Sequence, residues 1–181
     1  MNISITNLNK NDLPELLNWA KDEKALIQWC GPVFDYPLTM DQLKKYFAES
    51  LEPKPLRYIF KLMVANEIAG MCELGAVDRR NDSGSLCRIF VKNEFRGKGI
   101  AEKMISEVLD FGFYSVNLVR IELNVYTFNV PAFKCYEKLG FKREGTKRMN
   151  TKFKNEYWDC YFYGLLKEDW EKVKPSFANA K

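Results

Sequence analysis

The pattern of hydrophobic and polar positions predicts that the chain begins with a short strand and two helices. Asn2 to Leu8 alternates apolar and polar residues, as a half-buried strand does. From Leu13 to Ala20 the apolar residues recur at helical spacing, and a second helix is predicted from Thr39, a residue that suits a helix N-cap. Trp29 to Pro32 lies between the two and has the aromatic and turn residues of a loop.

The middle of the chain predicts an antiparallel sheet. β-branched and aromatic residues concentrate from Arg57 to Val64 and from Ile68 to Val77, with a tight turn between them. These two segments should therefore pair as a hairpin. Asp78 to Gly84 has turn chemistry, and strand character resumes from Ser85 to Val91. We expect this last segment to be a third antiparallel strand.

Helical spacing returns in the second half of the chain. Apolar residues from Ile100 to Phe113 predict a long amphipathic helix, and a strand is predicted from Arg120 to Val125. Pro131 suits the first turn of a further helix, because its missing N–H has no helical partner there, and Gly140 should end that helix. The last two predicted strands are Phe141 to Arg148 and Trp158 to Leu165.

Length and composition predict one globular domain over residues 1–181, with residues 174–181 as a tail. The hydrophobic fraction of 46% and the charged fraction of 29% argue against disorder. The net charge of +4 is mild, and the basic residues are scattered among acids. We therefore expect no nucleic-acid partner.

Cysteine and histidine usage excludes several kinds of site. The chain has five cysteines, an odd number at wide spacing without a C-x-x-C pair, and no histidine. A zinc site and a disulfide framework are therefore not expected, and a Ser-His or Cys-His nucleophilic mechanism is excluded. The N-terminal residues lack the pattern of a signal peptide, and no apolar run approaches the length of a membrane span. We expect a protein of the reducing cytoplasm that is not bound to a membrane.

The segment from Val91 to Ala101 has the pattern of a phosphate-binding turn. A strand leads through a glycine-containing turn into the first turn of a helix, where backbone N–H groups lack helical partners and the helix dipole adds positive charge. Gly97 and Gly99 let the main chain approach an anion, with Arg96 and Lys98 beside it. The segment fits neither a Walker A loop nor a dinucleotide fingerprint. Taken alone, it is equally compatible with a packing turn.

Two motifs resemble those of a known family. The Arg-x-x-Gly-x-Ala pattern that begins at Arg96 is similar to the pyrophosphate-binding motif of the GNAT superfamily of N-acetyltransferases. The segment from Tyr126 to Phe141, with Asn129, Ala132 and Tyr136, resembles that family's second conserved segment. The resemblance extends from about residue 68 to residue 166. It implies an α/β (α+β) fold with a mixed, mainly antiparallel twisted sheet of six to seven strands, flanked by about four helices.

Within the superfamily, the chain looks most like ribosomal-protein N-terminal (alanine/serine) acetyltransferases and spermidine N-acetyltransferases. Gly140 to Gly145 and Tyr157 to Asp159 carry this resemblance. It implies acetyl-CoA as co-substrate without a metal, a small-molecule amine or a protein N-terminus as acceptor, and a homodimer in many members. Residues 1–56 would then form the acceptor-side helices, and residues 57–166 the core with the acetyl-CoA site.

The resemblance also implies how the cofactor binds. The strand before the turn and the strand after the long helix should splay apart, so that the pantetheine arm lies in the gap, and a bulge near Ile89 would point an N–H at the thioester carbonyl. Asn129 is either a helix N-cap or a ligand to a pantetheine amide. The residues expected to bind the cofactor are Ile89, Phe90, Val91, Arg96, Gly97, Lys98, Gly99, Ile100, Ala101, Asn129 and Ala132.

Two residues are candidates for acid and base catalysis. The family position of Tyr136 predicts a general acid that protonates the departing thiolate, and the alternative is a core tyrosine on an apolar helix face. Glu73 is the carboxylate most expected to face the acceptor cleft and act as the base. At the position where some relatives place a base, this chain has Leu86. A surface or salt-bridged Glu73 is an equally good interpretation.

The acceptor is not identified by the sequence. Trp29, Phe34 and Tyr36 are candidate walls of the acceptor site or, equally, packing residues, and no acidic cluster argues for a polyamine. We expect transfer of an acetyl group from acetyl-CoA to a primary amine by direct attack. The alternative is a CoA-binding regulatory module that is catalytically silent.

Overall fold

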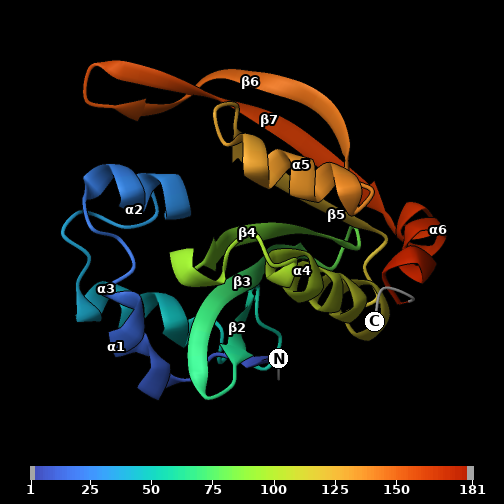
Figure 1. The fold of residues 1–181 in the computed structure, drawn as a ribbon, viewed down its shortest axis with the longest axis horizontal. Coiled ribbons are helices and arrows are strands. Elements are labelled where there is room, and N and C mark those ends of the chain that lie inside the picture. Colours follow the sequence, from blue (N-terminus) through green and yellow to red (C-terminus); the bar gives the residue numbers. More distant parts are fainter. Residues whose placement is uncertain (1–2, 179–181) are drawn as a thin grey trace.

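A computed structural model describes residues 3–178 as one seven-stranded sheet with helices on both faces (Figure 1). The strands are β1 (Ile3–Asn7), β2 (Tyr58–Val64), β3 (Glu67–Asp78), β4 (Ser83–Val91), β5 (Arg120–Tyr126), β6 (Lys142–Phe153) and β7 (Glu156–Leu166). Their order in the sheet is β1-β2-β3-β4-β5-β7-β6, and every neighbouring pair is antiparallel except β4 and β5. The predicted mixed, mainly antiparallel sheet is confirmed.

Six α-helices surround the sheet in the described part of the chain, where about four were expected. They are α1 (Leu13–Leu16), α2 (Glu23–Cys30), α3 (Met40–Ala48), α4 (Ile100–Asp110), α5 (Val130–Lys138) and α6 (Lys167–Ala178). Short 3-10 turns cover Lys10–Asp12 and Asn93–Phe95, and a π-helical turn, Phe111–Ser115, extends α4.

Helices α1, α2 and α6 differ from the sequence-based expectation. Helix α1 ends at Leu16, where helical spacing to Ala20 was expected. Trp29 was predicted to lie in a loop, but it belongs to α2, which begins where the Asp22 side chain accepts a hydrogen bond from the Ala25 amide at 2.8 Å. Helix α6 covers residues 174–178, the start of the predicted tail, whereas residues 179–181 lie outside the described residues. Trp170 explains the docking of α6, because its buried indole donates to an Asp110 oxygen at 2.9 Å.

The sheet separates two hydrophobic clusters. Neighbouring residues of one strand point to opposite faces, so Ile59 packs with α1, α2 and α3, whereas Phe60 packs with α4 on the other side. Met71 and Cys72 divide in the same way on β3. Because both faces are covered, β3 reads as a continuous buried run instead of an alternating one.

The parallel pair β4 and β5 is short. Only Ser83 to Ser85 pair with Arg120 to Glu122, and no pairing continues beyond them. The two strands therefore separate toward Val91 and Tyr126, as the resemblance implied. The β6–β7 hairpin continues beyond this opening and passes above α2 (Figure 1).

A β-bulge interrupts β4 just before its end. Met71 pairs with Phe90, but Glu73 pairs with Cys87, so a single residue of β3 faces both Arg88 and Ile89. The bulge expected near Ile89 is thereby confirmed.

Gly70 lets β3 approach β4 beside this bulge, which generates a stability prediction. A Cβ at Gly70 would overlap the Phe90 carbonyl, a backbone group that cannot turn away. Gly70→Ala should therefore lower the free energy of unfolding by about 1–3 kcal/mol, measured by urea denaturation. The control is Gly145→Ala, where no atom lies within 4 Å of an added Cβ and a change below about 0.5 kcal/mol is expected. Equal effects of the two substitutions would contradict this account.

Candidate active site

A cleft of about 1000 Å³ joins the end of β4, the start of α4, one face of α5 and the α1–α2 region. It brings together ten of the eleven predicted cofactor residues and Tyr136. These ten are Ile89, Phe90, Val91, Arg96, Gly97, Gly99, Ile100, Ala101, Asn129 and Ala132. Lys98 is the exception, since its ammonium group donates to the Glu94 carbonyl at 2.9 Å and does not line the cleft.

The turn between β4 and α4 forms an open cradle. Gly97 and Gly99 have φ values of +73° and +70°, and no atom lies within 4 Å of a Cβ added at either position. Gly99 is the N-cap of α4 and offers no side-chain cap, so the amides of the first helical turn are left for another acceptor. The Arg96 Nε donates to the Val91 carbonyl at 2.8 Å, which holds the guanidinium beside the cradle. This arrangement fits a diphosphate.

Asn129 occupies the N-cap position of α5 without capping the helix. Its side chain makes no capping hydrogen bond, and its backbone carbonyl accepts from the Ala132 and Phe133 amides at 3.1 and 3.2 Å. Pro131 lies in the first turn of α5, as predicted. The side-chain amide of Asn129 therefore has no capping role, and the residue lines the cleft.

Tyr136 lies at the cleft, mostly enclosed by the core. Its side chain is 8% exposed, and its ring meets Phe141 edge-on with centroids 6.1 Å apart. Among the described residues, no hydrogen-bond partner holds its hydroxyl. Burial raises the pKa of the Tyr136 phenol well above its usual value, so the hydroxyl keeps its proton at neutral pH.

Glu73 does not face the cleft, contrary to the expectation from the sequence. It is fully buried, and Arg88 grips both of its oxygens, with Nε at 2.7 Å from Oε2 and Nη2 at 2.5 Å from Oε1. The Tyr46 hydroxyl donates to Oε2 at 2.5 Å. The salt-bridged interpretation of Glu73 matches this geometry, and its role as the base stays a prediction.

Burial and charge in this cluster shift the pKa values of Arg88 and Tyr46. Burial opposes the charge of Arg88, but the hydrogen bonds and the negative charge of Glu73 outweigh it and raise the pKa of Arg88. Burial, together with the Glu73 charge, raises the pKa of the Tyr46 phenol. Tyr46 was not among the predicted site residues, because a tyrosine on the inner face of a helix has no sequence signal that separates it from core packing.

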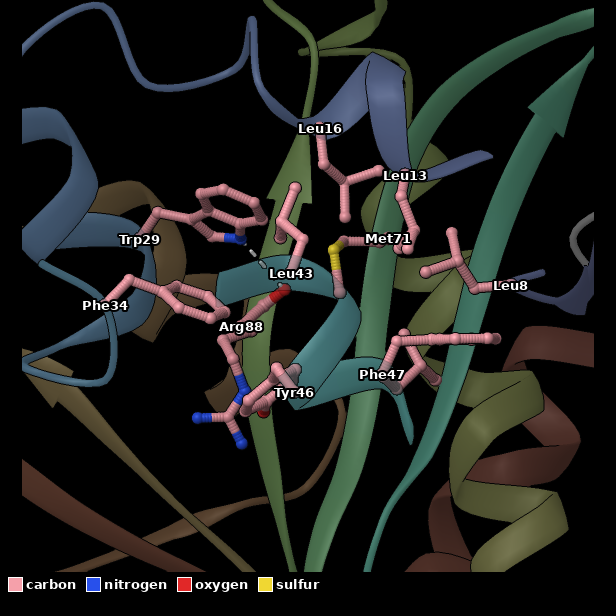
Figure 2. Close-up of a pocket in the computed structure, with 11 residues that line it drawn as sticks. Leu8, Leu13, Leu16, Trp29, Phe34, Leu43, Tyr46, Phe47, Met71 and Arg88 are labelled. Carbon is pink, nitrogen blue, oxygen red and sulfur yellow. Dashed lines mark hydrogen bonds between the residues drawn. The ribbon is translucent and has the colours of Figure 1, made fainter. Parts of the chain in front are cut away.

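The three predicted acceptor residues do not form one wall. Trp29 lines the cleft. Its Nε1 donates to the Arg88 carbonyl at 3.2 Å, a hydrogen bond visible in Figure 2, which draws a neighbouring small pocket. Phe34 does not line the cleft. It lines a pocket of about 10 Å³ beneath the α1–α3 region, which Trp29 also lines, and it packs edge-on against Tyr46. Tyr36 is half exposed and lines neither space.

A second tryptophan at the cleft was missed. Trp19 stacks on Phe90 with centroids 4.6 Å apart and an interplanar angle of 12°, and it also contacts Trp29 at 5.6 Å. All three rings line the cleft. The sequence placed Trp19 on a predicted helix, where only the tertiary fold could bring it onto β4.

Two general searches of the described chain gave no candidates. No helix formed by residues 3–178 has the length and apolar character needed to cross a membrane. Over the same residues, no group of three or more Cys, Asp or Glu side chains is arranged to hold a metal ion.

Comparison with known proteins places this geometry in a family. Residues 2–142 match the model of the acetyltransferase (GNAT) domain. The chain is 34% identical over 137 residues to the SPbeta prophage-derived uncharacterized N-acetyltransferase YokL of Bacillus subtilis, a match that covers 75% of this chain and 76% of that protein. It is 26% identical over 143 residues to the spermidine N(1)-acetyltransferase of Vibrio cholerae, covering 79% of this chain and 80% of that protein.

The fold agrees with a solved structure of the same kind. The crystal structure of spermidine N-acetyltransferase from Vibrio cholerae in complex with CoA and spermine superposes with a TM-score of 0.82 at 22% identity, covering 93% of this chain and 98% of that one. The open cradle at α4, the gap beside β4 and the match over residues 2–142 lead to one conclusion. The chain belongs to the GNAT family and is an acetyl-CoA-dependent N-acetyltransferase.

Proposed function

We propose that this chain transfers the acetyl group of acetyl-CoA to a primary amine of a small molecule or a protein N-terminus, by direct attack through a tetrahedral intermediate. One observation supports this most: a single cleft contains the uncapped start of α4, the separated end of β4 and Tyr136. The first of these features suits a diphosphate, the second a thioester, and the third a departing thiolate.

The residues that would hold the cofactor follow from the cleft. The first amides of α4, with Gly97, Gly99 and Arg96, would bind the diphosphate. The main chain from Ile89 to Val91 and the Asn129 side chain would bind the pantetheine arm in the gap beside β4. Lys98 would contribute positive charge near the turn, although its ammonium donates to the Glu94 carbonyl and does not line the cleft. When bound, acetyl-CoA supplies an activated acetyl thioester.

Proton transfer completes the reaction. The attacking amine needs a free lone pair and so reacts after it loses its proton. Tyr136 would give its proton to the thiolate that leaves, a role supported by its place at the cleft and by its unbonded hydroxyl. Glu73 was predicted to accept the amine proton, but it is fully buried, does not line the cleft and already accepts three hydrogen bonds from Arg88 and Tyr46.

The acceptor and the setting are also proposals. Relatives are named for spermidine and for amino acids, and amines of these classes are candidates here. Neither nucleic acid nor membrane is proposed as a partner, and a homodimer is proposed from the family resemblance. The five free cysteines support a reducing cytoplasm as the location.

The alternative proposal is a silent CoA-binding module. Thiol release from acetyl-CoA should be followed with amino acids, polyamines, aminoglycosides and N-terminal peptides as acceptors. The enzyme should accelerate release at least tenfold with one class above the others. If no amine accelerates release while calorimetry detects acetyl-CoA binding, the chain is the silent module. The absence of binding would reject both proposals.

The cradle generates a binding prediction. In Gly99→Ala, the new methyl group would enter the space left for the diphosphate, and alanine is strained at a φ of +70°. The dissociation constant for acetyl-CoA, measured by calorimetry, should rise roughly tenfold or more. Gly145→Ala, on β6 and outside the cleft, should stay within about twofold of the parent. If the affinity of Gly99→Ala for acetyl-CoA is unchanged, the proposal that this turn binds the diphosphate is wrong.

Tyr136 generates a kinetic prediction. Tyr136→Phe keeps the ring in its buried site and removes only the proton donor, so kcat should fall about 10²- to 10⁴-fold while acetyl-CoA affinity is kept. Tyr157→Phe, an exposed phenol on β7, is the matched control and should keep full activity. A Tyr136→Phe enzyme with parental kcat would leave this residue with a packing role only.

The pH dependence follows from the same groups. The free fraction of an alkyl amine with a pKa of about 10.4 increases tenfold for each pH unit below that value. Because burial raises the pKa of Tyr136, its acid form persists through this range and does not oppose the rise. With an alkyl amine as acceptor, we expect kcat/KM to rise continuously from pH 6 to pH 9. A descending limb within that range would show that an acid with a lower pKa is at work.

A further inference from the structure

The bulge in β4 places an arginine in a backbone conformation that favours glycine. Arg88 has a φ of +47°, in the left-handed region, and together with Ile89 it faces the single residue Cys72 on β3. Ile89 has no register partner on β3 or on β5 and lines the cleft. The conformation of Arg88 therefore decides where the following N–H group, that of Ile89, points.

Two side chains hold Arg88 in this conformation. The carboxylate of Glu73 binds the guanidinium through two hydrogen bonds, at 2.7 and 2.5 Å. The indole Nε1 of Trp29 donates to the Arg88 backbone carbonyl at 3.2 Å, as Figure 2 shows. The side chain of Arg88 is thus held by β3, through Glu73, and its main chain is held by α2, through Trp29.

The surroundings fix Glu73 itself. The Tyr46 hydroxyl donates to the carboxylate oxygen Oε2 of Glu73. The other oxygen, Oε1, occupies space that a Cβ at position 75 would overlap, so Gly75 leaves room for it. The neighbours of this cluster include the apolar Phe34 and Leu43, and the Arg57 guanidinium lies over the Tyr46 ring at 3.9 Å from its centroid. A buried ion pair in such a place contributes little net stability because both charges lose their water. Its presence points to a conformational role.

We infer that Glu73 and Trp29 are positioning residues that hold the Arg88 bulge, so that the Ile89 N–H faces the gap between β4 and β5, where it can stabilise the oxyanion formed from the thioester. Glu73 acts through Arg88, since it does not line the cleft itself. This inference rests on the proposed function and replaces the predicted roles of Glu73 as base and Trp29 as acceptor wall.

The test uses the whole chain and a variant that removes the need for the anchors. Glu73→Gln should lower kcat about tenfold, with little change in the KM for acetyl-CoA. The expected loss is smaller than that for removing an oxyanion donor completely, because the Ile89 N–H would be displaced and not deleted. Trp29→Phe keeps an aromatic ring and the ion pair but removes the indole donor, so kcat should fall less, by several-fold. The double variant Glu73→Gln/Arg88→Gly should recover to within about threefold of the parent, because glycine adopts a positive φ without support.

Each alternative role gives a different result. If Glu73 is the base, Glu73→Gln flattens the pH profile of kcat and the double variant stays as slow as the single one. If the pair only stabilises the fold, the unfolding temperature falls and kcat is unchanged. Either result overturns the inference. Trp158→Phe removes an indole donor outside the cleft and should leave kcat unchanged, as a control for Trp29→Phe.

A second readout separates this inference from the proposed function. Deuterium exchange of the β4 residues 87–91 should speed up at least several-fold in Glu73→Gln and return toward the parental rate in the double variant. If no amine causes thiol release in the parent protein, the proposed function fails, but the exchange still tests the anchors. Exchange that is equal in all variants would overturn the positioning role. If Glu73→Gln does not fold, Trp29→Phe supplies the same comparison.

Discussion

The structure depends on the separation of two parallel strands. β4 and β5 pair over three residues and then diverge, so the main-chain groups at the end of β4 lack the sheet partners that buried backbone normally requires. Antiparallel pairing with β3 keeps β4 in place on its other side. The sheet therefore holds one strand rigidly while it leaves that strand's free edge open to a ligand that can be bound as an additional strand.

Two kinds of positive group lie near this opening, and they differ in the desolvation free energy that each requires. At the start of α4, backbone amides provide partial charge without a desolvated ion, and the glycines before them keep the approach open. Within the bulge, Arg88 is a full charge that is mostly buried and is neutralised by Glu73. The first arrangement is suited to binding an anion from solvent, whereas the second is suited to holding a backbone conformation.

Aromatic residues of the α1–α2 region line part of the cleft. Trp19 and Trp29 pack on Phe90, so the helical layer and the end of β4 are joined by ring contacts. Trp29 also reaches the bulge through its indole N–H. Helix α2 therefore contacts β4 both through aromatic rings and through the hydrogen bond from Trp29 to Arg88.

Local patterns determined much of this protein from the sequence alone. The β-branched hairpin of β2 and β3, the amphipathic spacing of α4 and the glycine turn before it depend on neighbouring residues, which is why their positions and the cofactor cradle could be predicted. Only the tertiary structure decided the environment of single side chains. Glu73 is buried and paired with Arg88 of the β4 bulge, Phe34 faces the core, and Trp29 reaches the bulge. Burial and pairing of this kind arise from contacts between segments far apart in the chain, which no local pattern encodes.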